Sequence, residues 1–169
     1  MIIVHGKIVD WDLQFFASLS GLLDSQLEEL ERTAREVPDP DAWGVYDHYE
    51  EVCGIGFVAC QRYLAAIYGS LAITKPKALA LGQRLDCGLT VAQAVNHAAN
   101  YWKHHDEWHR KKEEKRDANT KQAIEKFGVK VGRDYVLSCV LTGLTHSPTR
   151  FKALVSLMEE WREEVRKHA

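Results

Sequence analysis

The chain has 169 residues, of which 46% are hydrophobic and 27% are charged, and its net charge is −2. This length and composition are typical of one soluble globular domain spanning residues 1–169, which would bury about two-thirds of the surface of its unfolded chain. The near-neutral charge excludes a global attraction to nucleic acids or anionic membranes. Binding of a polyanion would need a local basic patch.

The expected location is the cytoplasm, with no membrane contact. The apolar stretches are interrupted before they reach the ~20 residues of a membrane span. The first five residues lack the basic and apolar regions of a signal peptide. Cysteines occur without any Cys-x-x-Cys spacing and are expected to be reduced thiols, mostly core fillers. They are Cys53, Cys60, Cys87 and Cys139.

The first helical segment is expected to begin after Asp10, whose carboxylate can accept a hydrogen bond from the first turn. Gly21 is expected to weaken this segment, and Asp24 or Ser25 to restart it. The predicted buried side chains are Trp11, Phe15, Phe16 and Leu19 before the weak point and Leu23, Leu27, Leu30 and Ala34 after it.

The prolines in residues 38–41 disfavour helix before them, so a break is predicted there. Asp41 is then expected to cap a second long helix that continues to about Ser70. Gly54 and Gly56 lie inside this helix, where each costs about 1 kcal/mol relative to alanine. We therefore expect a neighbouring helix to approach closely at these glycines. The apolar stripe of the helix consists of Tyr46, Tyr49, Cys53, Phe57, Cys60, Leu64, Ile67 and Leu71.

The second half of the chain contains further helical signals. Thr90 and Gln93 match a capping box, which predicts a helix that continues past Trp108 into a solvated, charged extension at residues 111–116. The other predicted helices are Lys75 to Leu85, opened by Pro76; Asn119 to Phe127, ended by Gly128; Asp134 to Leu144; and a last helix opened by Ser147 and Pro148. The sequence thus predicts an all-α fold, a single helical bundle of about five or six helices.

The last helix carries a long apolar seam at helical spacing. We expect this seam to pack within the bundle, and a symmetric dimer formed through it is the alternative. Its members are Phe151, Leu154, Val155, Met158, Trp161 and Val165.

Residues 96–109 hold half of the eight histidines of the chain. Imidazole has an unperturbed pKa near neutrality, so this segment is the first place to look for proton transfer or metal binding. On a helical wheel the apolar side chains fall on one side and a set of polar groups on the other. The apolar side contains Val91, Val95, Ala98 and Trp102, and the polar side contains Asn96, Asn100, Lys103, His104 and Glu107.

Three interpretations of this segment are open. In the first, His104 is a general acid or base oriented by Asn100 and Glu107, and Lys103 stabilises developing negative charge. In the second, His105 and His109 share a metal ion through their i, i+4 spacing, with Asp106 or His97 as a further ligand. In the third, His105 is a hydrogen-bonded histidine at the edge of the core, and the asparagines and Trp108 stabilise packing.

The run Asn100-Tyr101-Trp102-Lys103-His104, followed by Asp106-Glu107, resembles the HEPN superfamily. Active members of that superfamily are metal-independent ribonucleases of toxin–antitoxin and phage-defence systems, and they commonly form their cleft across a homodimer. The motif histidine corresponds to His104 and the polar residue to Asn100. Ala99 stands where the family has an arginine, so Lys103, Arg62 or Arg84 would have to supply the missing charge.

This resemblance implies a ribonuclease or RNA-binding protein without a metal or cofactor. Its partners would be RNA, a cognate antitoxin or another protein, and a second copy of the chain. The implied catalytic residues are His104, Asn100, Lys103 and Glu107, and the implied nucleic-acid-binding residues are Asn96, His97, Arg62 and Arg84.

Two other functions remain as alternatives. One is a non-enzymatic helical adaptor that dimerises and uses the asparagine, histidine and tryptophan surface for partner contact. The other is a metal-binding helical-bundle hydrolase, with ligands drawn from His97, His105, His109 or the Asp47 and Glu50 pair. Arg62 interrupts an apolar helix, so we expect it to face inward and to pair with Asp47, Glu50 or Glu107.

Overall fold

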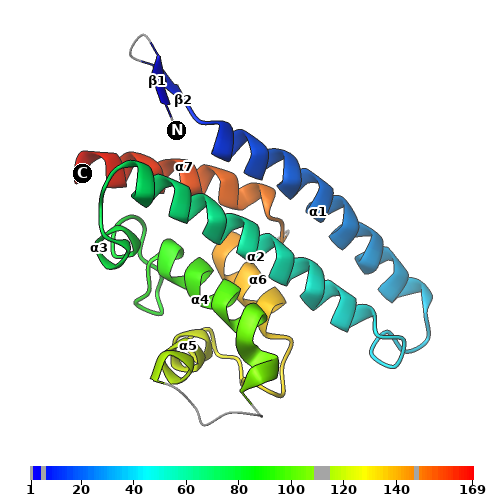
Figure 1. The fold of residues 1–169 in the computed structure, drawn as a ribbon. Helices are drawn as coiled ribbons and strands as arrows, with labels where there is room; N and C mark the ends of the chain where they lie inside the picture. The colour runs from blue at the N-terminus through cyan, green and yellow to red at the C-terminus, as the bar shows by residue number, and fades with distance from the viewer. Residues whose placement is uncertain (1, 5–6, 109–114, 147–148) are drawn as a thin grey trace.

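The computed structural model describes residues 2–4, 7–108, 115–146 and 149–169. The described part is a helical bundle with a small N-terminal hairpin, so the all-α prediction is confirmed apart from that hairpin (Figure 1). It contains seven α-helices, more than the predicted five or six, and a single 3₁₀ turn at His105–Glu107. The elements are β1 (Ile2–Val4), β2 (Lys7–Val9), α1 (Trp11–Glu36), α2 (Val45–Ser70), α3 (Lys75–Leu79), α4 (Val91–His104), α5 (Lys115–Glu125), α6 (Val136–Thr145) and α7 (Lys152–Lys167).

The two longest helices, α1 and α2, form an antiparallel pair (Figure 1). As predicted, Asp10 caps α1, and its Oδ1 accepts a hydrogen bond from the backbone N–H of Leu13 at 3.1 Å. Gly21 does not interrupt α1, because core contacts on both sides of it offset the small intrinsic cost of a glycine. Asp41 does not cap α2: it belongs to a preceding turn, which Gly44 closes with a φ of 68°.

Two of the three glycines of α2, Gly54 and Gly56, lie where other elements approach closely, as the sequence predicts. A methyl group at Gly54 would overlap the indole ring of Trp102, at the end of α4. A methyl group at Gly56 would overlap the ring of Phe151, which immediately precedes α7. The missing side chains of α2 therefore make room for two large aromatic residues from the other half of the chain.

Helix α4 lies at the centre of the bundle and contacts α2, α5, α6 and α7. The predicted capping box is present: the N–H of Gln93 donates to Thr90 Oγ1 at 3.1 Å, and the N–H of Thr90 donates to Gln93 Oε1 at 2.9 Å. Alanines occupy several positions on this helix, and they let its neighbours approach closely. Those that are almost fully buried are Ala92, Ala94, Ala98 and Ala99.

Two helices receive their N-terminal caps from distant parts of the chain. Asp24 of α1 accepts hydrogen bonds from the backbone N–H groups of Phe151 and Lys152 at 2.7 and 3.0 Å, at the start of α7. Glu50 of α2 does the same at the start of α6, with two bonds of 2.7 Å. Carboxylates favour the positive end of a helix dipole, so these contacts join the long helices to the later ones. The predicted openers of the last helix, Ser147 and Pro148, lie outside the described residues.

Several other predicted boundaries differ from the structure. Helix α3 stops at Leu79 instead of Leu85, and α4 stops at His104 instead of continuing past Trp108. Helix α5 spans Lys115–Glu125, earlier than the predicted range. Most of the charged extension predicted at 111–116 lies outside the described residues.

The seam of α7 packs inside the bundle, as expected. Its members Phe151, Leu154, Met158, Trp161 and Val165 are each at most 2% exposed. The alternative of a dimer formed through this seam is therefore wrong, because the bundle itself covers the seam.

The prediction that Trp11 and Phe15 are buried is also wrong. They are 66% and 70% exposed, because the inward side of α1 is the one that carries Phe16, Leu23 and Leu27. Helix α2 is long and apolar enough to cross a membrane by length and composition, but its inward side forms part of the bundle core.

Substitution of Gly54 by alanine should destabilise the fold by about 1–3 kcal/mol, because the new methyl group displaces the Trp102 ring in a well-packed core. Urea denaturation followed by circular dichroism measures this change. Gly21→Ala is the matched control. Its methyl group enters open space within a helix, so it should stabilise the protein by about 0.5–1 kcal/mol. Equal effects of the two substitutions would contradict the close approach of α2 and α4.

Candidate functional site

The predicted polar side of α4 does not face solvent along its length. Asn96 is only 7% exposed, and its Oδ1 accepts a hydrogen bond from Gln61 Nε2 of α2 at 3.0 Å. The same Gln61 nitrogen lies 3.0 Å from Asn100 Oδ1. These amide groups form a contact between two helices, so the expectation that they line an open polar face is wrong for Asn96 and Asn100.

Lys103 belongs to the same network. Its Nζ donates to Gln61 Oε1 at 2.7 Å, so one glutamine joins both asparagines and the lysine. The Asn100 oxygen that was expected to orient His104 already accepts a hydrogen bond from Gln61. The side chain of His104 is partly exposed at the end of α4 and has no hydrogen bond to another described residue. Glu107 follows in the 3₁₀ turn and is exposed.

Of the three cations that could supply the charge of the HEPN motif, only Lys103 adjoins His104 in sequence, and its Nζ is hydrogen-bonded to Gln61. Ala99 is fully buried in the core, so this position has no room for a long cationic side chain. Arg62 is exposed, not inward-facing as predicted, and forms no ion pair with the described residues. Arg84 is also exposed, and it donates to the carbonyl of Gly88 in its own loop at 3.3 Å.

An aromatic cluster terminates α4. The ring of Tyr101 stacks on His105 with centroids 4.9 Å apart and meets Trp108 edge-on at 5.5 Å. His105 Nδ1 lies 3.2 Å from the carbonyl oxygens of Tyr101 and Trp102, and its Nε2 lies 3.1 Å from Asp106. His105 therefore satisfies backbone acceptors at the end of a helix, which fits the structural interpretation of this residue.

His97 lies apart from the other described histidines. Its Nδ1 is buried without a hydrogen-bond partner in the described part of the protein. Burial, with a contribution from the charges of Lys75 and Lys126, lowers the pKa of His97. The lowered pKa favours the neutral imidazole, which is a poor contact for a phosphate group.

The proposed metal ligands are not gathered into a site. Among the described residues, no group of three or more His, Cys, Asp or Glu side chains is arranged to hold a metal ion. Glu50 caps α6, and Glu51 accepts a hydrogen bond from the Trp102 indole at 3.2 Å. His109 lies outside the described residues.

The hollow beside the histidine turn is acidic. It has a volume of about 440 Å³ and contains His105 together with five carboxylates, against one arginine, Arg133. Such a surface repels the phosphate backbone of a nucleic acid. The carboxylates belong to Asp41, Asp47, Glu50, Glu51 and Asp134.

All four cysteines are free, but only Cys53 and Cys60 are buried. Burial raises the pKa of both thiols, so they remain protonated and unreactive at neutral pH. Cys139 is exposed, so the expectation that the cysteines are mostly core fillers holds for only half of them.

A buried ionic cluster, not predicted from the sequence, joins both ends of the chain. Arg162 of α7 is 5% exposed, and its Nη1 donates to Asp10 Oδ2 at 2.9 Å. The hydroxyl of Tyr63 donates to the same oxygen at 2.9 Å. A signal was present, because Arg162 follows Met158 by four residues and precedes Val165 by three, both of them on the buried seam of α7.

Comparisons with protein-family models, with curated proteins and with solved structures find no match to this chain.

Replacement of Gln61 by alanine should lower the free energy of unfolding by about 1–3 kcal/mol, because it leaves the acceptors of Asn96 and Asn100 without their donor. Arg62→Ala, at the exposed neighbouring position, should change stability by less than about 0.5 kcal/mol. Chemical denaturation of both variants tests the assignment of Gln61 as the inward residue. A larger loss from the Arg62 variant would overturn it.

The Asp10 cluster predicts a stability change at acid pH. Burial alone raises the pKa of Asp10, but hydrogen bonds from Arg162, Leu13 and Tyr63 outweigh it and lower the pKa below the ordinary value of 3.8. A carboxyl group with a lowered folded-state pKa stabilises the fold above its unfolded pKa and loses this contribution as the pH falls through its folded pKa.

Asp10→Asn should therefore cost about 3 kcal/mol at pH 7, and its difference from the wild type should narrow at pH 3. Urea titrations at the two pH values measure this. Asp86→Asn, at an exposed carboxyl, is the control and should change stability little at either pH. If the stability difference between Asp10→Asn and the wild type is the same at both pH values, the negative charge of Asp10 does not contribute to stability.

Proposed function

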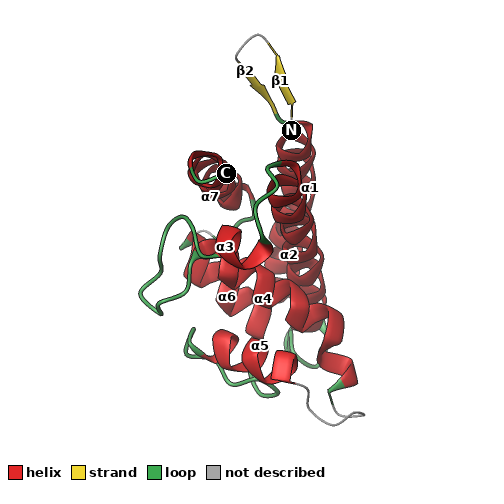
Figure 2. Ribbon diagram, turned by 60° about the vertical axis from the view of Figure 1, so that its left-hand side comes forward, coloured by secondary structure: helices red, strands yellow, loops and turns green. Residues whose placement is uncertain are grey.

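We propose that this protein is a non-enzymatic helical adaptor that acts as a symmetric homodimer. The proposed interface is the outer face of the α1–α2 pair, on the side away from the other helices (Figure 2). The observation that carries the proposal is the near-absence of exposed charge on the part of this face formed by residues 11–26 of α1 and 52–70 of α2, in a chain that is 27% charged.

The fully exposed positions of α1 between residues 11 and 26 are all uncharged. Of the two charged residues in this range, Asp24 is buried at the cap of α7 and Asp12 is partly buried. In α2, Arg62 is the only charged residue between Val52 and Ser70. Depletion of charge is the compositional mark of the centre of a protein interface. The exposed positions of α1 are Trp11, Gln14, Phe15, Ser18, Leu22, Ser25 and Gln26.

The same face exposes large apolar side chains. Trp11, Phe15 and Leu22 are 66%, 70% and 71% exposed, and they lie within about 40° of one another around the helix. Ile55 of α2 is 45% exposed. The contacts of Phe16 with Tyr63 and of Glu31 with Tyr49 define the antiparallel register, which places Ile55 within one turn of Leu22.

These four side chains expose apolar surface on the order of 500 Å², at the upper end of what monomers show. With the small and amide side chains around them, the area approaches the ~800 Å² that each partner contributes to a standard interface. The exposed area is therefore comparable with that of a small interface.

A second copy of the chain is the occupant that fits best. In a two-fold interface, the patch of one copy contacts the same patch of the other copy. A neutral apolar patch therefore brings no like charges together. An anionic membrane is a poorer match, because helices that lie on membranes carry rows of lysine and arginine beside the apolar face. Here Arg62 is the single cation of α2 after residue 52.

Adaptor function is favoured over the ribonuclease prediction by the surroundings of the histidine helix. The groups expected to bind and polarise a phosphate are hydrogen-bonded to Gln61, and the adjoining hollow is acidic. The HEPN resemblance, with RNA or an antitoxin as partner, and the cytoplasmic location stay predictions.

Dimerisation is tested by light scattering on a size-exclusion column at about 100 μM protein. The wild type should elute with the mass of two chains. Phe15→Glu and Leu22→Glu should elute as folded monomers, because each places two like charges at the two-fold contact. Ser156→Glu, on the exposed side of α7, is the matched control and should stay dimeric. A monomeric wild type would overturn the proposed interface.

The enzymatic alternative needs a separate assay. Wild-type protein and His104→Ala are incubated with RNA in the presence of EDTA, and we expect no cleavage by either. Cleavage that persists in EDTA and disappears in His104→Ala would overturn the non-enzymatic assignment and support the ribonuclease prediction.

A further inference from the structure

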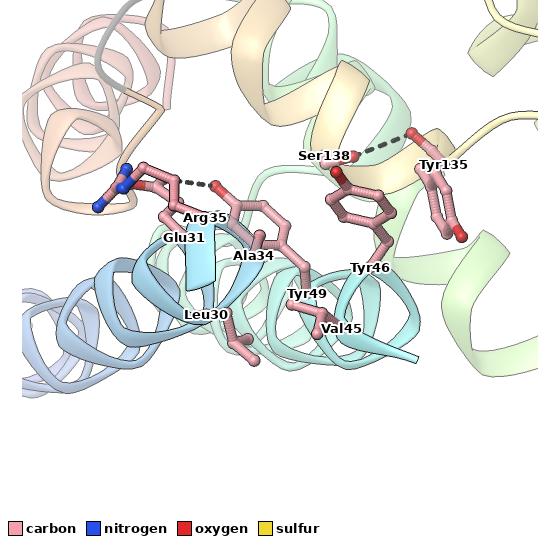
Figure 3. Close-up of a pocket in the computed structure, with 9 residues that line it drawn as sticks. All are labelled: Leu30, Glu31, Ala34, Arg35, Val45, Tyr46, Tyr49, Tyr135 and Ser138. Atoms are coloured by element: carbon pink, nitrogen blue, oxygen red, sulfur yellow. Dashed lines mark hydrogen bonds between the residues drawn. The ribbon is translucent and has the colours of Figure 1, made fainter. Parts of the chain in front are cut away.

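A cavity of about 450 Å³ opens between the C-terminal half of α1, the first turns of α2 and the start of α6 (Figure 3). Its volume is within the ~300–1,000 Å³ typical of small-molecule sites. Three of its residues are tyrosines, and the dimer interface proposed above does not use them. The lining residues are Leu30, Glu31, Ala34, Arg35, Val45, Tyr46, Tyr49, Tyr135 and Ser138.

The structure holds the three tyrosine rings in place. The hydroxyl of Tyr49 donates to Glu31 Oε1 at 3.2 Å, and the hydroxyl of Tyr135 donates to Asp41 Oδ1. The ring of Tyr46 lies against that of Tyr135, with centroids 5.4 Å apart and planes at 59°. Figure 3 shows the rings of Tyr49, Tyr46 and Tyr135 one after another along the cavity. Groups positioned in this way need little ordering when a ligand binds.

The electrostatic surroundings of these rings are negative. The hydrogen bond to Asp41, with a smaller contribution from the charges of Asp47 and Glu50, raises the pKa of Tyr135 to about 12. A phenol that donates to a carboxylate has a more electron-rich ring, which strengthens attraction of a cation to the ring face.

Two arginines lie near the cavity. Arg150 is paired with Glu31 at 2.7 and 2.9 Å and with Glu28 at 3.4 Å, so its charge is compensated. Arg35 also lines the cavity, but it is exposed, so water and salt screen its charge. The cavity therefore combines aromatic faces, an apolar wall and nearby carboxylates, which is the combination that binds organic cations.

We propose that this cavity binds a small organic cation of the quaternary or alkylated ammonium class, with the ammonium group against the three tyrosine rings. The apolar part of the ligand would lie against Leu30, Ala34 and Val45. The site is separate from the α1–α2 outer face, so it stands whether or not the protein dimerises.

Choline and its uncharged isostere 3,3-dimethyl-1-butanol are the test pair, titrated into the protein and followed by NMR. Choline should bind at least about tenfold more tightly than the isostere, since only the charge differs. Tyr46→Ala should weaken choline binding about tenfold, and Tyr46→Phe should retain it, because the ring face provides the interaction. Tyr46 is 40% exposed, so its truncation leaves the core intact.

Two controls define the chemistry of the site. Trp43→Ala removes an exposed aromatic residue that does not line the cavity, and it should leave choline binding unchanged. Arg35→Gln should leave choline binding unchanged or make it tighter. Equal binding of the isostere, insensitivity to Tyr46→Ala, or binding of benzoate that depends on Arg35 would each overturn the proposal. Leu22→Glu should bind choline as the wild type does, so failure of the dimer and failure of this site are distinguishable.

Discussion

The fit of Trp102 against Gly54 is the contact on which the rest of the structure depends. It brings the end of α4 against the middle of α2, and the two helices then meet along their length. Gln61 lies about two turns further along α2, where it reaches Asn96, Asn100 and Lys103 at once. Polar side chains that would define a reactive surface on an isolated helix become the polar part of a helix–helix contact. A buried amide whose hydrogen bonds are all made within the protein stabilises the fold. It could bind a substrate only by breaking those hydrogen bonds.

Carboxylates that are distant in sequence organise the remaining helices. Asp24 and Glu50 provide caps for α7 and α6, and Asp10 joins the start of α1 to Arg162 near the end of α7. Helices too short to be stable alone are thus held by groups on the two long ones. The same use of acidic residues leaves a negative field around the histidine turn and around the tyrosine-lined cavity. This field disfavours phosphate ligands and favours cations, so it bears on both proposals.

The surface divides into two kinds of region. Helix α7 presents a dense row of charges to solvent, as a solvated helix does, whereas residues 11–26 of α1 and 52–70 of α2 present Arg62 as their one exposed charged residue. The difference is not a requirement of the fold, since the inward sides of all three helices already supply the core. Exposed tryptophan, phenylalanine and leucine on a weakly charged surface are the observations on which the proposed dimer rests. The apolar seam of α7, which the sequence offered as a dimer contact, is buried in the core instead.

The sequence alone determined the features that depend on local spacing. Asp10 as a cap, the capping box at Thr90, the break at residues 38–41, the glycine-mediated packing in α2 and the buried seam of α7 all follow from the nearest few residues, and each is present. Tertiary structure decided the features that depend on contacts between distant segments, about which local spacing gives no information. Trp11 and Phe15 have the spacing of a buried face, but α2 and α7 lie on the opposite side of α1. The polar side of α4 became a contact because Gln61, 35 residues before Asn96, faces it. The cap of α7 comes from Asp24, which no inspection of residues 147–152 reveals, because a hydrogen bond between remote segments leaves no periodic trace in the chain.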